Sequence, residues 1–452
     1  MDLKRIQRFD SLLTDLYELT MAQAYFDQNM FAPATFSLFI RKYPPQRGYF
    51  VAAGLEHVVD FLENFHFSEN ALDFLKSLDM FSKAFLKYLK RLRFSGDVRA
   101  MPEGRIFFKD EPILEVTAPI IEAQLVESFL INAVNFPTTI ASKAARCYHA
   151  ARGRGLVDFS LRRTPGEDAG INVARASYLA GFDGTSNVLA GKFYDIPVSG
   201  TMAHSFVMSF EDEIEAFRAF ARTFGDATVL LIDTYDTLSG AEKSIQVARE
   251  MARQGRKLRG VRLDSGDMTV LSKSVRERLN AAGFDDVNIF ASGGFDEYKI
   301  DRSLADGARI DAFGVGTQMG VSADDPYLDI AYKLVRYDNR PVLKLSAGKQ
   351  TLVDEKQIFR RTAAGVMQHD RIALRGESRE GEPLLGVCMQ NGRREQPLES
   401  LAEIRSRFLH EFETLPAGTR RLNNPDPVPV EISHALQERQ HRAQRRAEAQ
   451  TV

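Results

Sequence analysis

Apolar, β-rich runs alternate with helical segments through the middle of the chain, and this alternation restricts the fold more than any other feature. Helical segments such as Glu211–Phe224 and Ala241–Arg253 separate the runs. Strands divided by helices predict a parallel sheet covered by helices. We expect an irregular TIM-like βα barrel, although an open doubly wound sheet fits the same alternation. Six strands are expected, at Leu156–Leu161, Ile196–Gly200, Thr228–Asp233, Leu258–Asp264, Val287–Ala291 and Ile310–Val315, with a possible seventh at Ile330–Arg336.

The flanking regions lack this alternation and predict a mixed α+β domain, formed by the N-terminal region together with C-terminal strands. Apolar residues at helical spacing predict a helix over Asn70–Arg93, and a second long helix should begin at Pro119 and break near Pro137. The expected organisation is an N-terminal α+β domain (1–117), the βα barrel (118–337), C-terminal strands packing on the N-terminal domain (338–433) and a basic, polar, solvated tail (434–452).

Composition narrows the choice of partners and compartment. The chain has 452 residues, of which 44% are hydrophobic, and its 59 Lys and Arg nearly balance its 61 Asp and Glu. Such a balance gives no global basic field for nucleic acid or an anionic membrane. Cys147 and Cys388 are far apart and have no companion at zinc-ligand spacing, which fits a reducing compartment. Without a signal-like or membrane-spanning run, we expect a cytoplasmic protein.

Polar groups gather where the expected barrel strands end, which is where reactive groups lie in βα barrels. Arg162 and Arg163 follow the first strand, and Arg262 lies in the fourth. Arginine makes paired charge-assisted bonds to phosphate or carboxylate, so these side chains are candidate anion ligands rather than surface ion pairs.

Two successive strands end in glycine-rich loops. Gly293 and Gly294 precede a helix, and Gly316 and Thr317 follow the last strand. Glycine allows backbone N–H groups to converge on a phosphate, and a helix N-terminus adds positive potential. Either loop alone is more often a tight turn, but the pair within one barrel predicts a sugar-phosphate site.

His204 follows the second expected strand, shortly after Thr201. Histidine can act as a base, a metal ligand or a covalent nucleophile, but its spacing alone equally fits a structural role. No second histidine stands at zinc-ligand spacing. Which residues bind a metal is left open; Asp233, Asp236, Asp264 and Asp267 can hold Mg²⁺ against a diphosphate or can pair with the arginines.

Read together, the motifs resemble the nicotinate phosphoribosyltransferases, a family of type II phosphoribosyltransferases, over about Leu12 to Phe359. The similar segments are Leu12–Met21 (LLTDLYELTM), Gly184–Gly191 (GTSNVLAG), Gly200–Ser205, Val261–Asp267 and Gly314–Thr317. The resemblance implies an ATP-dependent ligase of NAD biosynthesis. Such an enzyme joins nicotinate to 5-phosphoribosyl 1-pyrophosphate (PRPP) with Mg²⁺, and ATP phosphorylates His204.

The resemblance also assigns roles to single residues. Tyr17 would come from the neighbouring subunit of a homodimer and stack on the pyridine ring, with Phe159 on its other face. Arg262 and Thr201 would contact nicotinate and its surroundings. Arg162 and Thr317 would hold phosphates, and Asp264 would orient groups around the ribose.

Substrate choice is expected to depend on Ser186. The related nicotinamide enzyme has an aspartate there, which would repel the carboxylate of nicotinate, so serine favours nicotinate. The chain departs from the family at Ser160, where glycine is usual, and at Thr164-Pro165. The alternatives are a nicotinamide or quinolinate phosphoribosyltransferase, and a sugar-phosphate sensor without catalysis.

Overall fold

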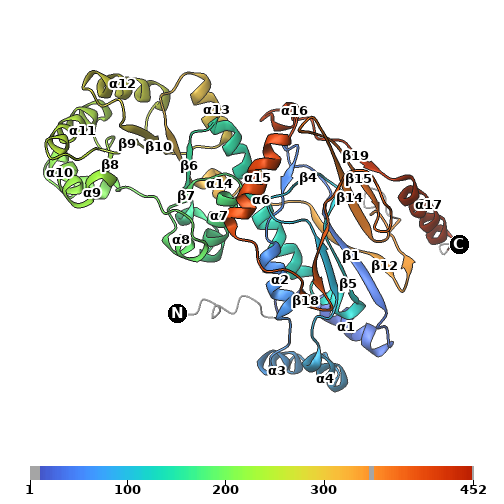
Figure 1. Ribbon diagram of the computed structural model, residues 1–452. Helices are drawn as coiled ribbons and strands as arrows, with labels where there is room; N and C mark the ends of the chain where they lie inside the picture. The colour runs from blue at the N-terminus through green and yellow to red at the C-terminus, as the bar shows by residue number, and fades with distance from the viewer. Residues whose placement is uncertain (1–10, 346–350, 450–452) are drawn as a thin grey trace. The chain divides into compact units, whose positions relative to one another are not determined.

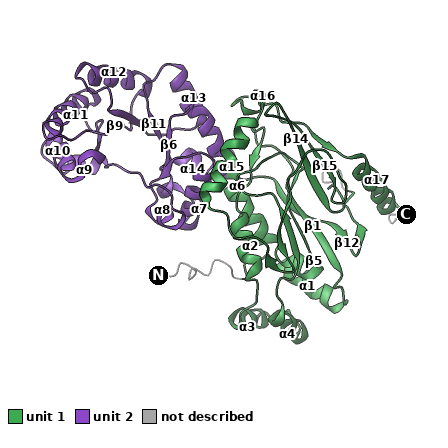
Figure 2. Ribbon diagram, in the orientation of Figure 1, with its two compact units in different colours: residues 1–139, 327–452 green, residues 140–326 purple. Residues whose placement is uncertain are grey.

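The computed structural model describes residues 11–345 and 351–449 and divides into two compact units. Met1–Thr139 and Tyr327–Val452 form the first unit, and Ile140–Pro326 form the second (Figure 2). The first ten and last three residues, which belong to the predicted N-terminal domain and tail, lie outside the described residues, as do residues 346–350 of the predicted C-terminal strands.

The main sheet of the first unit combines strands from both ends of the chain (Figure 1). β1 (Pro33–Ile40) pairs antiparallel with β12 (Ile330–Tyr337) on one side and β5 (Pro112–Pro119) on the other. Every residue of β1 after the first is buried, so this strand forms the centre of the core. The remaining strands are β3 (Asp97–Ala100), β17 (Gly386–Gln390), β18 (Arg393–Arg394) and β13 (Arg340–Pro341).

Smaller sheets and helices complete this unit, which is the predicted mixed α+β domain. The sheets are β16 (Glu382–Pro383), β14 (Lys356–Ala363), β15 (Val366–Leu374) and β19 (Val430–Ile432), and the pair β2 (Phe50–Val51) and β4 (Ile106–Phe107). The helices are α1 (Leu16–Asp27), α2 (Leu55–Glu63), α3 (Glu69–Ser77), α4 (Lys83–Arg91), α5 (Ile120–Leu125), α15 (Leu401–Thr414), α16 (Ala417–Arg420) and α17 (His434–Glu448).

Two predicted helices differ from the structure. The single helix expected over Asn70–Arg93 is two helices, because Ser82 caps a second one by accepting a hydrogen bond from the N–H of Phe85. The break expected near Pro137 is absent, since α6 (Glu127–Ala151) runs through it. Proline leaves the carbonyl of Ala133 without its helical donor. Gly54 packs against this carbonyl so closely that a Cβ would lie 2.0 Å from the oxygen.

The C-terminal tail (434–452), predicted to be solvated, forms a helix whose first turns pack against the first unit. Ser433 caps α17, Leu436 is fully buried, and the Gln440 side chain bonds the N–H of Val353 and the carbonyl of Thr351. The arginines that follow are mostly exposed. The basic character of this segment therefore lies on its outer surface.

The second unit is a parallel sheet that curls into an irregular barrel, as predicted. Its hydrogen-bonded order is β7-β6-β11-β10-β9-β8, so β6, the first strand of the unit, pairs with β11, the last (Figure 2). That pairing favours a barrel over an open doubly wound sheet, although in the described residues no strand pairing joins β7 to β8. The strands are β6 (Gly155–Asp158), β7 (Gly184–Thr185), β8 (Val229–Leu231), β9 (Gly260–Leu263), β10 (Asn288–Ala291) and β11 (Ala312–Val315).

Helices follow the strands and cover the outside of the barrel. α10, α11 and α12 pack side by side outside β8 and β9 (Figure 1). The helices are α7 (Glu167–Leu179), α8 (Val188–Tyr194), α9 (His204–Met208), α10 (Glu213–Phe224), α11 (Thr237–Ala252), α12 (Met268–Ala281), α13 (Glu297–Ala305) and α14 (Thr317–Gly320), with short 3₁₀ turns η2 (Leu161–Arg163) and η3 (Gly225–Ala227).

The prediction of a barrel strand is wrong for two segments. Ile196–Gly200 forms only an isolated bridge, from Val198 to Thr185, and Pro197 beside it has no N–H to donate to a ladder. Ile330–Arg336 is not a seventh barrel strand, because it lies in β12 and pairs with β1 in the first unit.

Candidate active site

The strand ends of the barrel converge on Arg262, which lies in β9 and is half-buried. Its Nε donates to Ser292 Oγ (2.9 Å) and its Nη1 to Thr201 Oγ1 (3.1 Å). Its Nη2 donates to Asp264 Oδ1 (2.7 Å), and the guanidinium lies 5.4 Å from the centroid of the Phe159 ring. The structure thus brings together four residues that the sequence predicted for one site: Phe159, Thr201, Arg262 and Asp264.

His204 belongs to the same group. It is the first residue of α9, its Nδ1 lies 3.1 Å from Thr234 Oγ1, and its Nε2 lies 3.8 Å from Asp264 Oδ2. The side chain is 38% exposed, so the ring faces polar groups and solvent rather than an apolar core. Thr234 was missed by the sequence analysis, although its place directly after Asp233 could have indicated it.

Two aspartates give the site its acidic side. Partial burial acts to raise the pKa of Asp264, but the hydrogen bonds from Ser292 and Arg262 and the nearby positive charge outweigh it, so this pKa is lowered. Asp233 follows β8, and its Oδ2 accepts from the N–H of Asp264 (2.8 Å) and from Ser265 Oγ (2.7 Å). Its Oδ1 is buried and has no hydrogen-bond partner among the described residues.

The glycine loops end the neighbouring strands. Gly293 has φ +98°, and a Cβ there would lie 2.1 Å from the carbonyl oxygen of Asp264, so only glycine fits. Gly294 follows with φ +66°. Lys299 Nζ donates to the Gly293 carbonyl (2.6 Å), which adds a cation that the sequence analysis missed. Gly316 and Thr317 lie where β11 leads into α14.

The other predicted residues of the barrel lie after its first two strands. Arg162 is exposed on η2, after β6. Ser186 follows β7 and is half-buried, and its N–H donates to the carbonyl of Asp158 (2.8 Å). Both are therefore at the same end of the barrel strands as Arg262.

Tyr17 belongs to the first unit, near the start of α1. It is 46% exposed, and Leu13 and Leu16 beside it are also about half exposed. Partial burial raises the pKa of Tyr17, as does the carboxylate of Glu127. The neighbouring Glu18 is fully buried and accepts hydrogen bonds from the N–H (3.0 Å) and hydroxyl (2.7 Å) of Ser128.

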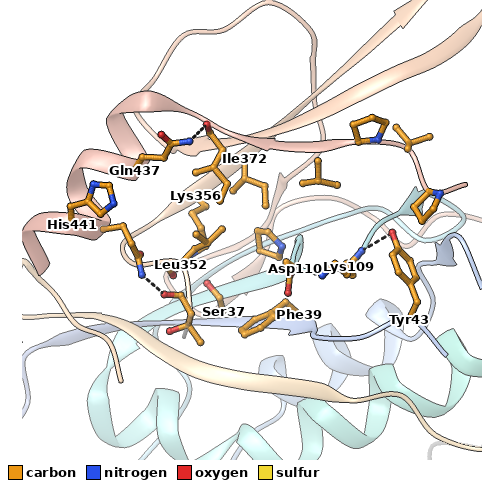
Figure 3. A pocket seen from close by; sticks show the side chains of 18 residues that line it. Ser37, Phe39, Tyr43, Lys109, Asp110, Leu352, Lys356, Ile372, Gln437 and His441 are labelled. Atoms are coloured by element: carbon orange, nitrogen blue, oxygen red, sulfur yellow. Dashed lines mark hydrogen bonds and ion pairs between the residues drawn. The ribbon is translucent and has the colours of Figure 1, made fainter. Parts of the chain in front are cut away.

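The first unit also contains a cavity of about 830 Å³, which holds none of the predicted site residues (Figure 3). Its wall mixes apolar residues, such as Phe39, Leu352 and Ile372, with polar and charged ones, such as Lys109, Asp110 and His441. The buried amine of Lys356 is engaged by Glu115 (3.0 Å) and by the carbonyl of Asp354 (2.6 Å).

Among residues 11–345 and 351–449, none of the helices combines the length and hydrophobicity needed to span a bilayer. In the same residues, no three His, Cys, Asp or Glu side chains are grouped as a metal site.

A parallel βα barrel with an arginine, a histidine and two aspartates at its strand ends defines the chain as a barrel protein with an enzyme-like site. Comparison with known proteins makes this specific. Models of the nicotinate phosphoribosyltransferase N-terminal domain, family and C-terminal domain match residues 12–135, 155–365 and 351–440. The chain belongs to the nicotinate phosphoribosyltransferase family.

Individual relatives agree. The chain is 49% identical to "Nicotinate phosphoribosyltransferase pncB2" of Mycobacterium tuberculosis, over 95% of this chain and 93% of that protein. Its fold is similar to the crystal structure of human nicotinic acid phosphoribosyltransferase, with TM-score 0.85, 30% identity, and 95% and 99% of the two chains covered. It is also similar to a nicotinate-nucleotide pyrophosphorylase of Pyrococcus furiosus, with TM-score 0.74, 25% identity, and 89% and 95% covered.

Proposed function

We propose that this chain joins nicotinate to the ribose-phosphate of PRPP, forming nicotinate mononucleotide and pyrophosphate in NAD biosynthesis. ATP hydrolysis is coupled to the reaction through phosphorylation of His204. The observation that carries this proposal is the connected group Arg262–Asp264–His204 at the strand ends, in a chain that matches the family over nearly its whole length.

The pyridine ring of nicotinate stacks on Phe159, and its carboxylate is bound on the side of Arg262 and Thr201. Ser186 adds no negative charge to this side, which favours nicotinate over nicotinamide. Tyr17 of a second copy closes the other face of the ring. The exposed Leu13, Leu16 and Tyr17 support this homodimer, because an apolar patch of this kind is typical of an interface.

Departure of pyrophosphate leaves positive charge on the ribose. Asp264 is suited to stabilise that charge, since its lowered pKa keeps it ionised at neutral pH. Arg162, Thr317 and the loops at Gly293, Gly294 and Gly316 hold the phosphates, so the sugar is fixed at both ends.

The residues present fit Mg²⁺. Asp233 Oδ1 is a buried carboxylate oxygen with no hydrogen-bond partner in the described part of the chain. Mg²⁺ commonly binds one or two carboxylates and completes its shell with substrate phosphates and water. Asp233 would hold the ion, which supplies positive charge to neutralise the departing diphosphate.

His204 is placed to accept the terminal phosphoryl group of ATP. The ionised Asp264 favours a proton on Nε2, 3.8 Å away, and therefore a lone pair on Nδ1. With this tautomer, the hydrogen bond between Thr234 Oγ1 and Nδ1 (3.1 Å) has the hydroxyl as its donor in the resting form. The Nδ1–phosphorus bond forms as the bond to the leaving ADP breaks.

A substrate panel tests the reaction. The protein is incubated with PRPP, Mg²⁺ and either nicotinate, nicotinamide or quinolinate, with and without ATP, and nucleotide formation is measured. We expect nicotinate to react fastest and ATP to increase product formation. Faster conversion of nicotinamide or quinolinate would overturn the substrate assignment, and nucleotide binding without turnover would indicate a sensor.

The His204→Ala variant tests the coupling. Radiolabel transfer from ATP to the protein and ATP hydrolysis should both be lost, while weak phosphoribosyl transfer persists. His434→Ala, which removes an exposed histidine of the other unit, is the control and should behave as wild type. Label retained on the His204→Ala protein would contradict the phosphohistidine.

A further inference from the structure

Asp158, the last residue of β6, is fully buried and has no cation beside it among the described residues. Its Oδ1 accepts from the N–H of Ser160 (2.9 Å) and from Ser160 Oγ (2.5 Å), and its Oδ2 accepts from Thr185 Oγ1 (2.7 Å). Burial raises its pKa, and these hydrogen bonds act in the opposite direction. An unpaired buried carboxylate is a poor stabiliser, so its presence calls for another explanation.

The two partners of Asp158 lie in the two elements proposed to bind nicotinate. Ser160 lies between Phe159 and Arg162, and Thr185 directly precedes Ser186. The Asp158 carboxylate therefore connects the segment of Phe159, which is proposed to stack on the pyridine, with the segment of Ser186, which is proposed to favour nicotinate over nicotinamide.

The connection continues beyond Thr185. Thr185 Oγ1 accepts from the N–H of Asn187 (3.0 Å), and the Asn187 side chain caps α8 by accepting from the N–H of Ala190 (3.1 Å). Asn187 Nδ2 also donates to the carbonyl of Gly170 in α7 (3.1 Å). The position of the Ser186 turn is thus set by Asp158 on one side and by two helices on the other.

Close packing, rather than hydrogen bonds alone, fixes the position of Phe159 and Ser160. A Cβ at Gly314 would lie 2.8 Å from the Phe159 ring, and one at Gly320 would lie 2.3 Å from the Ser160 Cβ. These glycines leave space that Phe159 and Ser160 fill. Gly320 thus provides the room for the Ser160 side chain.

An ionised carboxylate only accepts hydrogen bonds, so it orients every hydroxyl around it as a donor. With Asp158, both Ser160 and Thr185 donate, and the Thr185 oxygen remains free to accept from Asn187. An asparagine must keep its oxygen toward the Ser160 N–H, and its amide would then donate to Thr185 Oγ1 and leave the buried Thr185 hydroxyl proton without its acceptor. Asp158→Asn therefore reverses the Thr185 hydrogen bond and keeps the Ser160 connection.

We propose that Asp158 is a positioning residue that sets the spacing between Phe159 and Ser186, and thereby the width and selectivity of the pyridine slot, without touching substrate. This inference rests on the proposed function, since the slot is the one assigned to nicotinate. It differs from a purely structural role in predicting a selective change in nicotinate binding.

The test compares Asp158→Asn, Thr185→Val, Thr185→Ser and the Asp158→Asn/Thr185→Val double variant. The KM and kcat for nicotinate, the KM for PRPP, the nicotinate-to-nicotinamide preference and Tm are measured. Asp158→Asn and Thr185→Val should each raise the nicotinate KM about 10- to 100-fold, as expected for a buried hydrogen-bonding group left unpaired. The PRPP KM and kcat should change much less, and the nicotinate preference should fall.

Three comparisons make the result decisive. Thr185→Ser keeps the hydroxyl and should restore a wild-type KM, and the double variant should be no worse than either single one. Ser244→Ala, which removes a buried hydroxyl bonded to a carbonyl in α11, should lower only Tm. If Asp158→Asn fails to fold, Thr185→Val against Thr185→Ser decides alone.

A nicotinate KM within twofold of wild type in Thr185→Val would overturn the inference. It would also be overturned if Tm and kcat fell while the KM for nicotinate and the KM for PRPP rose to a similar extent. A wild-type protein unable to use nicotinate would instead overturn the proposed function.

Discussion

Each unit contains a network of ion pairs around one arginine, and the two networks differ in how much solvent reaches them. In the first unit the buried Arg360 pairs with Asp370 (2.6 Å) and Glu411 (3.0 Å) and donates to the carbonyl of Ile106 (2.7 Å). In the second unit Arg262 leads to Asp264 and His204, whose side chains are each about a third exposed. The closed network connects strands, whereas the open one leaves charged groups facing solvent, where a ligand can reach them.

A perturbed pKa alone does not separate the two kinds of network. Burial raises the pKa of Glu111 in the first unit well above its ordinary value, and the neighbouring Asp370 carboxylate raises it further. This pair lies beside Arg360 in the interior, with no exposed reactive group. Access to the charged groups, rather than the size of the shift, distinguishes the barrel site.

The largest effect should follow from opening the closed network. Arg360→Met leaves Asp370 buried without its cation and removes one of the two arginine partners of Glu411, which keeps Arg105, so the free energy of unfolding should fall by about 3–5 kcal/mol. Denaturant unfolding measures this loss. A fall below about 1 kcal/mol would mean that the network is not structural.

In the network of Arg262, Asp264 and His204, a substitution should reduce the reaction rate more than the stability. Asp264→Asn removes the charge that pairs with Arg262 and faces His204, so kcat should fall about 100-fold or more while stability changes less than in Arg360→Met. Steady-state kinetics and thermal unfolding on the same preparation check both parts. Loss of stability without loss of rate would place Asp264 among the structural pairs.

A smaller effect concerns Glu18, which lies beside Tyr17. Burial raises its pKa to about 7 in the folded chain, against hydrogen bonds from Thr14 and Ser128, whereas an unfolded glutamate titrates near 4.3. The folded state then holds the proton more tightly, so the contribution of Glu18 to stability should be fully present below about pH 4.3 and be lost as pH rises to about 7, by on the order of 1–3 kcal/mol. In Glu18→Gln this dependence should flatten, as followed by Tm at several pH values; an unchanged slope would exclude Glu18 as its source.

The smallest effect is expected at Arg361, the neighbour of Arg360 on β14. Its ion pair with Glu380 is exposed, with side-chain exposures of 50% and 77%. Arg361→Gln should change the free energy of unfolding by no more than about 1 kcal/mol. It is the matched control for Arg360→Met, and equal losses in both variants would remove the distinction between buried and exposed pairs.

The sequence predicted the barrel because its strands are apolar and end in polar groups. It misassigned Ile330–Arg336, because a strand's own residues do not reveal which sheet it joins, and its partner β1 lies about 300 residues earlier. The site residues were found through residue types typical of chemistry. Asp158 was missed as a site residue because it reads as part of a buried strand, and its role depends on the hydroxyls around it.

The order of the strands in the first unit has a consequence for synthesis. The pairing of β1 with β12 requires residues 330–337, so one edge of β1 stays uncovered until the barrel residues have left the ribosome. At 5–20 residues per second this interval is on the order of ten seconds or more. An uncovered strand edge can pair with other chains. The nascent protein therefore passes through a period in which it depends on chaperones or on rapid barrel folding, and a transcript truncated before β12 should yield aggregates rather than a smaller soluble domain.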